Sequence, residues 1–209
     1  PGEAISVHKE AMFRFLRLSS QAKVHALWQV WADSETWSEM ESVLRTKELR
    51  LRRTLNYYGF QPADLYQEWK RARKTVLRFL SLLKVDRWVP VDRFLQIAYS
   101  VHPDLLHAHT DAAVWWLESP KTKKQFGTTI EDWQESHGQF VLAVLEGPLY
   151  RLGWVRLGYT SAQEPVLKAF QLIDRGVQVL VILRPGADTP ALENDHIGRT
   201  FKLVPEVFL

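Results

Sequence analysis

The sequence predicts a mainly α-helical fold that carries one small β-hairpin. Apolar residues recur at spacings of three and four over 20–32, 64–83 and 131–145, which is typical of helices with one buried face. Two short apolar runs, 154–159 and 166–173, follow and are separated by polar residues, which indicates a pair of strands. We therefore expect an α+β protein in which helices dominate.

Composition supports a folded core and excludes several functions. Hydrophobic residues make up 46% of the 209 residues, including nine Trp and ten Phe, so disorder is not expected. The chain has no Cys, which excludes disulfides, zinc–thiolate sites and thiol catalysis. That absence fits a reducing compartment, and we expect a cytoplasmic protein. No run of 18 uncharged apolar residues occurs, so no membrane partner is expected.

The first part of the chain is predicted to be helical. Residues 20–32 form a helix that Asp33 and Ser34 end, and a shorter helix follows over 37–44. Thr36 is expected to cap it, with Glu39 three residues later as in a capping box. The turn-rich stretch 56–62 is the best domain boundary, so 1–62 is predicted to be an N-terminal helical segment.

The clearest helix is predicted over 64–83. Its apolar residues fall within an arc of roughly 100° on one face: Leu65, Trp69, Ala72, Val76, Phe79, Leu80 and Leu83. The other side is assigned five cations: Lys70, Arg71, Arg73, Lys74 and Arg78. Either this side is a solvated outer face, or it contacts the phosphates of a nucleic acid.

A short extended link, 86–90, precedes a helix over 91–101, which His102 and Pro103 end. A further helical segment is predicted over 104–117, where Trp115 is expected in the core and Trp116 at its edge. A polar loop over 119–129 completes this part.

The last predicted elements surround two glycines. In the helix 131–145, capped by Thr129, the buried stripe includes His137. Gly147 and Pro148 restart the helix, and Gly153 ends it in a left-handed conformation. The two strands follow, and a final helix is predicted over 175–183, capped by Asp174.

The order from residue 64 onward is helix, extended link, helix, insert, helix, hairpin and helix. This is the order of a winged-helix domain, a variant of the helix-turn-helix, which we assign to 63–183. Residues 184–209 are then a C-terminal extension, expected to lead into a region beyond Leu209 because the chain reads as part of a longer protein. The segment 1–62 is a short helical unit, with a degenerate second winged helix as an alternative.

Four pieces of sequence resemble the bacterial and archaeal helicase-associated domain that is similar to the N-terminal domain of XPB-type repair helicases. They are ALWQVWADSETWSEM (26–40), RARKTVLRFLSLLKVDRWVPVDRFL (71–95), EDWQESHGQFVLAVLEGPLYRLGWVRLG (131–158) and FQLIDRGVQVL (170–180). The order of these pieces carries the resemblance, and Asp174 stands where the family usually has Thr. The resemblance implies a nucleic-acid context and names no catalytic residue.

No catalytic motif is found in the sequence. It has neither a GxxxxGK[ST] phosphate loop nor a G-x-S-x-G elbow, so we expect a non-enzyme without cofactors. The stretch HPDLLHAHTD (102–111) is rich in potential metal ligands, but its histidines are two and five residues apart and do not share a helix face. Polar loop residues are therefore favoured over a metal site there. His137 is interpreted as a core histidine rather than a catalyst.

Charge gives the main functional indication. Residues 41–80 hold ten Lys or Arg against four acids, an excess that indicates a polyanionic partner. The helix 131–146 has four acids and no cation, so it is not expected to read a major groove.

We therefore expect an accessory module that binds DNA non-specifically through backbone phosphates. Its predicted contacts are Arg53, Lys70, Arg71, Arg73, Lys74, Arg78, Lys121, Lys123, Lys124 and Arg156. The alternative is a protein-interaction or dimerisation module without direct DNA contact, whose partner is a helicase or another protein subunit.

Overall fold

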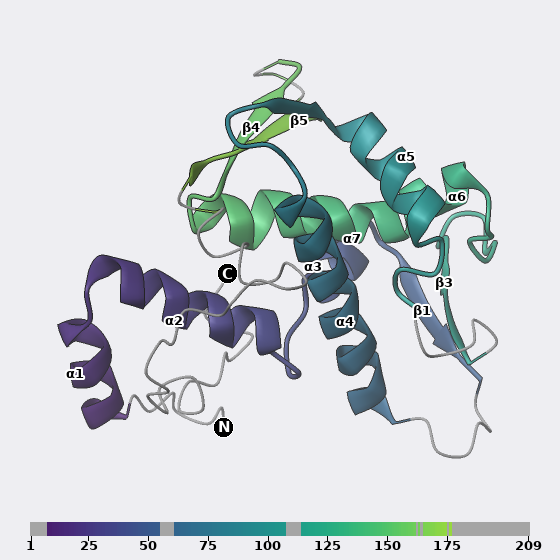
Figure 1. The fold of residues 1–209 in the computed structure, drawn as a ribbon. Coiled ribbons are helices and arrows are strands. Elements are labelled where there is room, and N and C mark those ends of the chain that lie inside the picture. Colours follow the sequence, from purple (N-terminus) through teal and green to yellow (C-terminus); the bar gives the residue numbers. More distant parts are fainter. Residues whose placement is uncertain are drawn as a thin grey trace.

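The computed structural model describes residues 8–54, 61–107, 114–161, 163, 165–174 and 176. Its helices pack together with two small antiparallel sheets at the edges of the fold, so the predicted class, mainly α with a small β component, is confirmed (Figure 1). The helices are α1 (Lys9–Arg17), α2 (Ser20–Asp33), α3 (Glu39–Thr46), α4 (Pro62–Ser81), α5 (Val91–Val101), α6 (Ile130–Glu135), α7 (His137–Val144) and the π-helical turn η1 (Leu145–Leu149). The strands are β1 (Arg50–Arg53), β2 (Trp88–Pro90), β3 (Trp115–Glu118), β4 (Val155–Tyr159) and β5 (Leu167–Leu172).

The N-terminal helices follow the prediction except at one cap. Helix α2 is confirmed, and the Ser19 hydroxyl accepts a hydrogen bond from the backbone of Ala22 at its start. Helix α3 begins at Glu39, and its cap is Ser38, whose hydroxyl accepts from the backbone N–H of Met40. The predicted cap at Thr36 is therefore wrong, because the Glu39 side chain is buried and binds elsewhere.

Helix α4 begins at Pro62, two residues before the predicted start. Asp64 accepts a hydrogen bond from the backbone of Gln61, and Pro at the first position needs no donor partner. The predicted apolar face is buried, and its buried residues include Leu65, Trp69, Ala72, Val76 and Leu80.

The predicted helix over 104–117 is wrong in its described parts, because 104–106 form turns and Trp115–Glu118 form strand β3. This strand pairs antiparallel with β1, from Arg50 opposite Glu118 to Arg53 opposite Trp115. Burial alternates along β3, with Trp115 and Leu117 in the core, as expected for a strand with one covered face. A short apolar run suits a strand or a buried helix equally, and the partner strand β1 has no apolar alternation to predict it.

The predicted helix 131–145 is divided at Ser136. This buried residue has φ −117° and ψ −82°, and its hydroxyl donates to the Asp132 carbonyl at 2.7 Å. Beyond α7 the chain passes into η1, where Gly147 takes φ −91° and ψ −105° just before Pro148. Gly153 has φ +69°, which confirms the predicted left-handed end.

The second sheet has the strand order β2-β5-β4, with both pairs antiparallel. Phe170 lies between Val89 and Leu157 on the inner face, and Gln171 lies between Trp88 and Arg156 on the outer face. Of the predicted final helix 175–183, only Gly176 is among the described residues, and the extension 184–209 lies outside them.

One hydrophobic core connects the elements on both sides of the predicted boundary at residue 62. It includes Trp28 from α2, Met40 from α3, Val76 from α4, Phe140 from α7 and Phe170 from β5. The domain limits remain a prediction. No helix in the described parts of the chain has the length and apolar character needed to cross a membrane.

Candidate nucleic-acid interface

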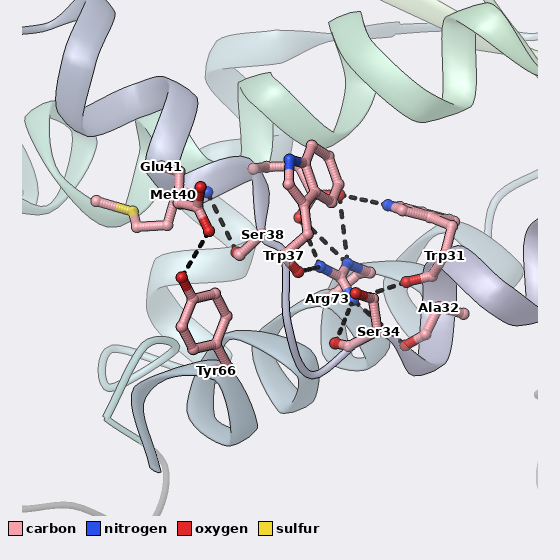
Figure 2. Close-up of polar contacts among 10 residues, drawn as sticks. Trp31, Ala32, Ser34, Trp37, Ser38, Met40, Glu41, Tyr66 and Arg73 are labelled. Atoms are coloured by element: carbon pink, nitrogen blue, oxygen red, sulfur yellow. Dashed lines mark hydrogen bonds and ion pairs between the residues drawn. The ribbon is translucent and has the colours of Figure 1, made fainter. Parts of the chain in front are cut away.

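Arg73, predicted to contact phosphates, is fully buried and is removed from the interface (Figure 2). Its guanidinium faces the Glu39 carboxylate, with Nη2 3.1 Å from Oε2. Glu39 also accepts a hydrogen bond from the indole N–H of Trp31. A charge held in this way cannot reach solvent, so Arg73 has a structural role.

The other donors of Arg73 bind backbone carbonyls where α2 ends. Nη1 donates to the carbonyl of Trp31 at 2.8 Å, and Nη2 donates to that of Trp37 at 3.1 Å. These acceptors come from residues that precede Arg73 by 36 or more positions. Helix periodicity placed Arg73 with the solvent-facing cations, and no local sequence pattern reveals such distant partners.

Three of the four remaining cations of α4 lie against acids. Lys70 contacts Glu35 and Lys74 contacts Asp33, each at 2.6 Å, and the bond from Lys70 is the main cause of the lowered pKa of Glu35. Arg71 contacts the buried carboxylate of Glu68 at 3.2 Å. Because these acids neutralise much of the charge, the predicted phosphate-binding face of α4 is weaker than its sequence suggests.

The exposed cations of β1 and of the loop after β3 do not form one patch with the β4–β5 hairpin. Arg78, Arg53, Lys121 and Lys123 are exposed, and none of them forms an ion pair within the described ranges. Lys124 is held by Asp132 at 3.2 Å, and the pKa of Asp132 is lowered mainly by a hydrogen bond from the Gly127 backbone. Figure 1 places β1 and β3 on the other side of α7 from the second sheet.

The outer face of the β2-β5-β4 sheet carries a row of three side chains. Trp88, Gln171 and Arg156 occupy paired positions on adjacent strands, and Arg156 Nη1 donates to Gln171 Oε1 at 3.4 Å. Trp88 is 52% exposed, and a Cβ placed on Gly158 would lie 3.1 Å from its ring carbon Cζ3. The indole therefore packs over a position without a side chain and leaves an aromatic surface in solvent.

Of this row, the sequence predicted Arg156 and missed Trp88. Arg87, directly before Trp88, and Lys168 on β5 are also exposed. The sequence predicts only an extended link over 86–90, around Trp88. Its alternation between Trp88 outside and the half-buried Val89 inside is a strand signal that was available.

Helix α7 is not free to enter a major groove. Its outward residues Gln139, Leu142 and Ala143 line a cavity of about 650 Å³ that α2 and α3 also line. Since a reading helix must project into a groove roughly 12 Å wide, a helix in such a concave surface cannot reach base edges. The position agrees with the expectation drawn from its lack of cations.

His107 and His137 pack against tryptophans of the core. His107 stacks on Trp115 with ring centroids 3.9 Å apart, and Nδ1 of His137 lies 3.0 Å from the Ser136 hydroxyl. Burial, and to a smaller extent the charge of nearby His107, lowers the pKa of His137 to about 3. Within the described residues no three His, Cys, Asp or Glu side chains are grouped as metal ligands, while His109 and Asp111 lie outside those residues.

No family model, curated protein or solved structure matches this chain. The resemblance to the helicase-associated domain of XPB-type proteins therefore remains a prediction.

Proposed function

We propose that this chain is a non-catalytic winged-helix module that binds nucleic acid mainly through backbone phosphates. The observation that carries the proposal is the outer face of the β2-β5-β4 sheet, where exposed Trp88 lies in register with Arg156. An aromatic surface beside cations is the arrangement by which proteins hold a nucleic-acid strand without reading its sequence.

The order of elements supports the winged-helix assignment. Helix α4 is followed by β2, α5, the helical pair α6 and α7, and the β4–β5 hairpin. The hairpin pairs with β2 through β5, as a wing does with the strand after the first helix. The strand β3 and its loop are then an insertion between the second and third helices.

The chemistry of the row favours contact with a strand's backbone and one base. Trp88 offers a ring face for stacking, and Arg156 is a phosphate donor. Every base has a stackable face, so this contact carries little sequence preference. Together with the resemblance to helicase-associated domains, it supports a place in a DNA-processing assembly, with DNA as the ligand and a helicase subunit as a candidate partner.

The proposal is tested by fluorescence polarisation with a labelled single-stranded DNA and its duplex at several salt concentrations. Trp88→Ala should weaken single-strand binding roughly 5- to 150-fold, since one stacked base is worth about 1–3 kcal/mol. Arg156→Glu should weaken binding and reduce the slope of log affinity against log salt by about 0.7–0.9 for each phosphate that is no longer neutralised.

Matched controls come from α1. The exposed fraction of Phe13 is 56%, similar to the 52% of Trp88, so Phe13→Ala controls for the loss of an exposed aromatic side chain. Arg14 is exposed, and Arg14→Glu controls for a change of net charge. If the α1 variants weaken binding as much as the sheet variants, or if no salt-dependent binding occurs, the proposal fails.

A further inference from the structure

Gln171 lies at the centre of the outer sheet face, and the function proposed above gives it no role. It belongs to the middle strand β5, directly opposite Trp88 on one side and Arg156 on the other. Side chains in such paired positions have Cβ atoms about 4.5–5.5 Å apart, so both neighbours are within contact range. Only 7% of Gln171 is exposed, because these neighbours enclose it. A polar side chain held between the stacking group and the phosphate donor is placed to contact the base that they hold.

Arg156 determines which way the Gln171 amide points. A guanidinium has donors and no acceptor, so the amide atom that faces it must be the oxygen. Nη1 of Arg156 donates to Oε1 of Gln171 at 3.4 Å. The amide nitrogen is therefore turned away from Arg156, and the side chain offers a donor to a ligand on this face.

The amide nitrogen of Gln171 is available for a ligand. It donates to no acceptor among the residues that the structure describes. It is also not one of the fully enclosed side-chain atoms without a partner in that part of the chain, so it reaches the molecular surface. Because its neighbours already hold the side chain, little rotamer freedom is lost when this donor binds.

Gly158 determines where the aromatic surface lies relative to this donor. A Cβ placed on Gly158 would be 3.1 Å from Cζ3 and 3.6 Å from Cη2 of Trp88. The indole therefore extends from β2 across β5 to β4, with one ring face on the sheet and the other in solvent. A base stacked on the free ring face has one edge beside Gln171, with Arg156 beyond it to contact a phosphate.

A donor at this position distinguishes bases that stacking alone does not. Adenine, cytosine and guanine each carry an exocyclic amino group, and an amino group facing the Gln171 nitrogen would set one donor against another. Thymine has carbonyl oxygens as its exocyclic polar groups and has no amino group, and uracil is the same in this respect. These two bases therefore accept from the amide whichever carbonyl edge they present.

We propose that Gln171 gives the outer sheet face a preference for thymine and uracil over bases that carry an exocyclic amino group. The inference rests on the proposed function, because it requires a base stacked on Trp88. Arg156 acts in it as the residue that orients the amide, and Gly158 as the residue that lets the indole lie along the sheet.

The test compares the affinities of the full chain for homopolymers of deoxythymidine, deoxyuridine and deoxycytidine of equal length, measured by fluorescence polarisation. Purine strands are left out, because they stack on themselves and would bind more weakly for that reason alone. Oligo-dT should bind roughly 2- to 12-fold more tightly than oligo-dC, the difference that one neutral hydrogen bond supplies. Oligo-dU should bind as tightly as oligo-dT, since the amide contacts a carbonyl and not the methyl group.

Two substitutions of Gln171 should change the ratio of these affinities. Gln171→Glu keeps the shape and replaces the donor by an acceptor, so every affinity falls and the preference shifts from oligo-dT towards oligo-dC, whose amino group donates to a carboxylate. Gln171→Met removes both the donor and the acceptor, so the affinities for oligo-dT and oligo-dC should become equal. The control is Gln29→Glu at an exposed position of α2, which makes the same change in net charge as Gln171→Glu and should leave the ratio unchanged.

Gly158→Ala separates the position of the indole from the choice of base. The added methyl group displaces the Trp88 ring, so all three homopolymers should bind more weakly. The amide of Gln171 is not altered, so the weaker binding that remains should still favour oligo-dT over oligo-dC.

Three outcomes would overturn the proposal. They are equal affinity of the unchanged chain for oligo-dT and oligo-dC, an oligo-dU affinity as low as that of oligo-dC, and a ratio that both Gln171 variants leave unaltered. The first two need no variant, so they decide the matter even if a substitution impairs folding. If Trp88→Ala weakens binding while the unchanged chain shows no base preference, only this inference fails. If Trp88→Ala and Arg156→Glu leave every affinity unchanged, the proposed function fails with it.

Discussion

Arg73 joins three segments that are separate in sequence. Its side chain binds the carbonyls that end α2, the carbonyl of Trp37 and the carboxylate of Glu39 in the first turn of α3. Its guanidinium carbon also lies 5.5 Å from the centre of the Trp31 ring, within cation–π range. The Arg73 side chain is fully buried, so these interactions form away from bulk water.

Arg73→Ala should lower the free energy of unfolding by about 3–5 kcal/mol, because it leaves the Glu39 carboxylate buried without a counter-charge. Urea denaturation followed by circular dichroism measures the change. Arg78→Ala on the same helix removes an exposed arginine, and its effect should stay within about 0.5 kcal/mol. Equal effects of the two substitutions would show that burial of Arg73 does not matter.

His137 should make stability depend on pH. Its pKa is about 3 in the folded chain and near 6.5 when unfolded, so the unfolded state binds the proton more readily. The free energy of unfolding does not depend on this group above pH 6.5. As the pH falls from 6.5 towards 3, it decreases by about 1.4 kcal/mol for each pH unit. Stability curves measured between pH 7.5 and 4 should therefore fall less steeply for His137→Phe than for the unchanged chain. Parallel curves would contradict this.

At the scale of elements, local patterns predicted most helices and the strands β4 and β5. Helix α5 has its predicted bounds, and Val91, Phe94, Leu95 and Ala98 face inward as expected. The patterns did not predict β1 or β3, since each is stabilised by a partner more than 60 residues away. They also missed the break between α6 and α7, where a serine within an apolar stripe binds the preceding turn.

Gly138 and Gly153 should respond differently to substitution by alanine. Gly153 has φ +69°, so Gly153→Ala forces a side chain into the left-handed region and should cost about 1 kcal/mol. Gly138 lies in α7, and an added Cβ would meet its nearest atom at an ordinary 3.5 Å. Gly138→Ala should be neutral or should raise the melting temperature, because alanine favours helix. A lower melting temperature for Gly138→Ala than for Gly153→Ala in thermal melts would contradict this prediction.

At the scale of the whole molecule, composition predicted a basic surface but not which cations are free. The acids that neutralise Lys70 and Lys74 are Glu35, just after α2, and Asp33, the last residue of α2, and only the packing of α2 on α4 brings them close. The sequence did not predict the cavity lined by α2, α3 and α7 either, because these helices come together only in the folded chain. Arg156 was predicted because its strand signal and its charge are both local.

The continuous core gives an expectation for a chain that begins at Gln61. Such a chain lacks α2, α3 and β1, so Arg73 loses its acceptors and β3 loses its only pairing strand among the described residues. We expect no cooperative thermal transition and strong binding of a hydrophobic dye. A sharp transition would instead support the predicted boundary at residue 62.

Pairing between β1 and β3 also determines what happens as the chain leaves the ribosome. Arg53 is made 62 residues before its partner Trp115, and Arg50 is made 68 residues before Glu118. At roughly 5–20 residues per second, β1 waits about 3 to 14 s for its partner. During that time its edge and the apolar side chains beneath it are exposed in the cell, although three arginines in four residues make this strand a poor template for aggregation.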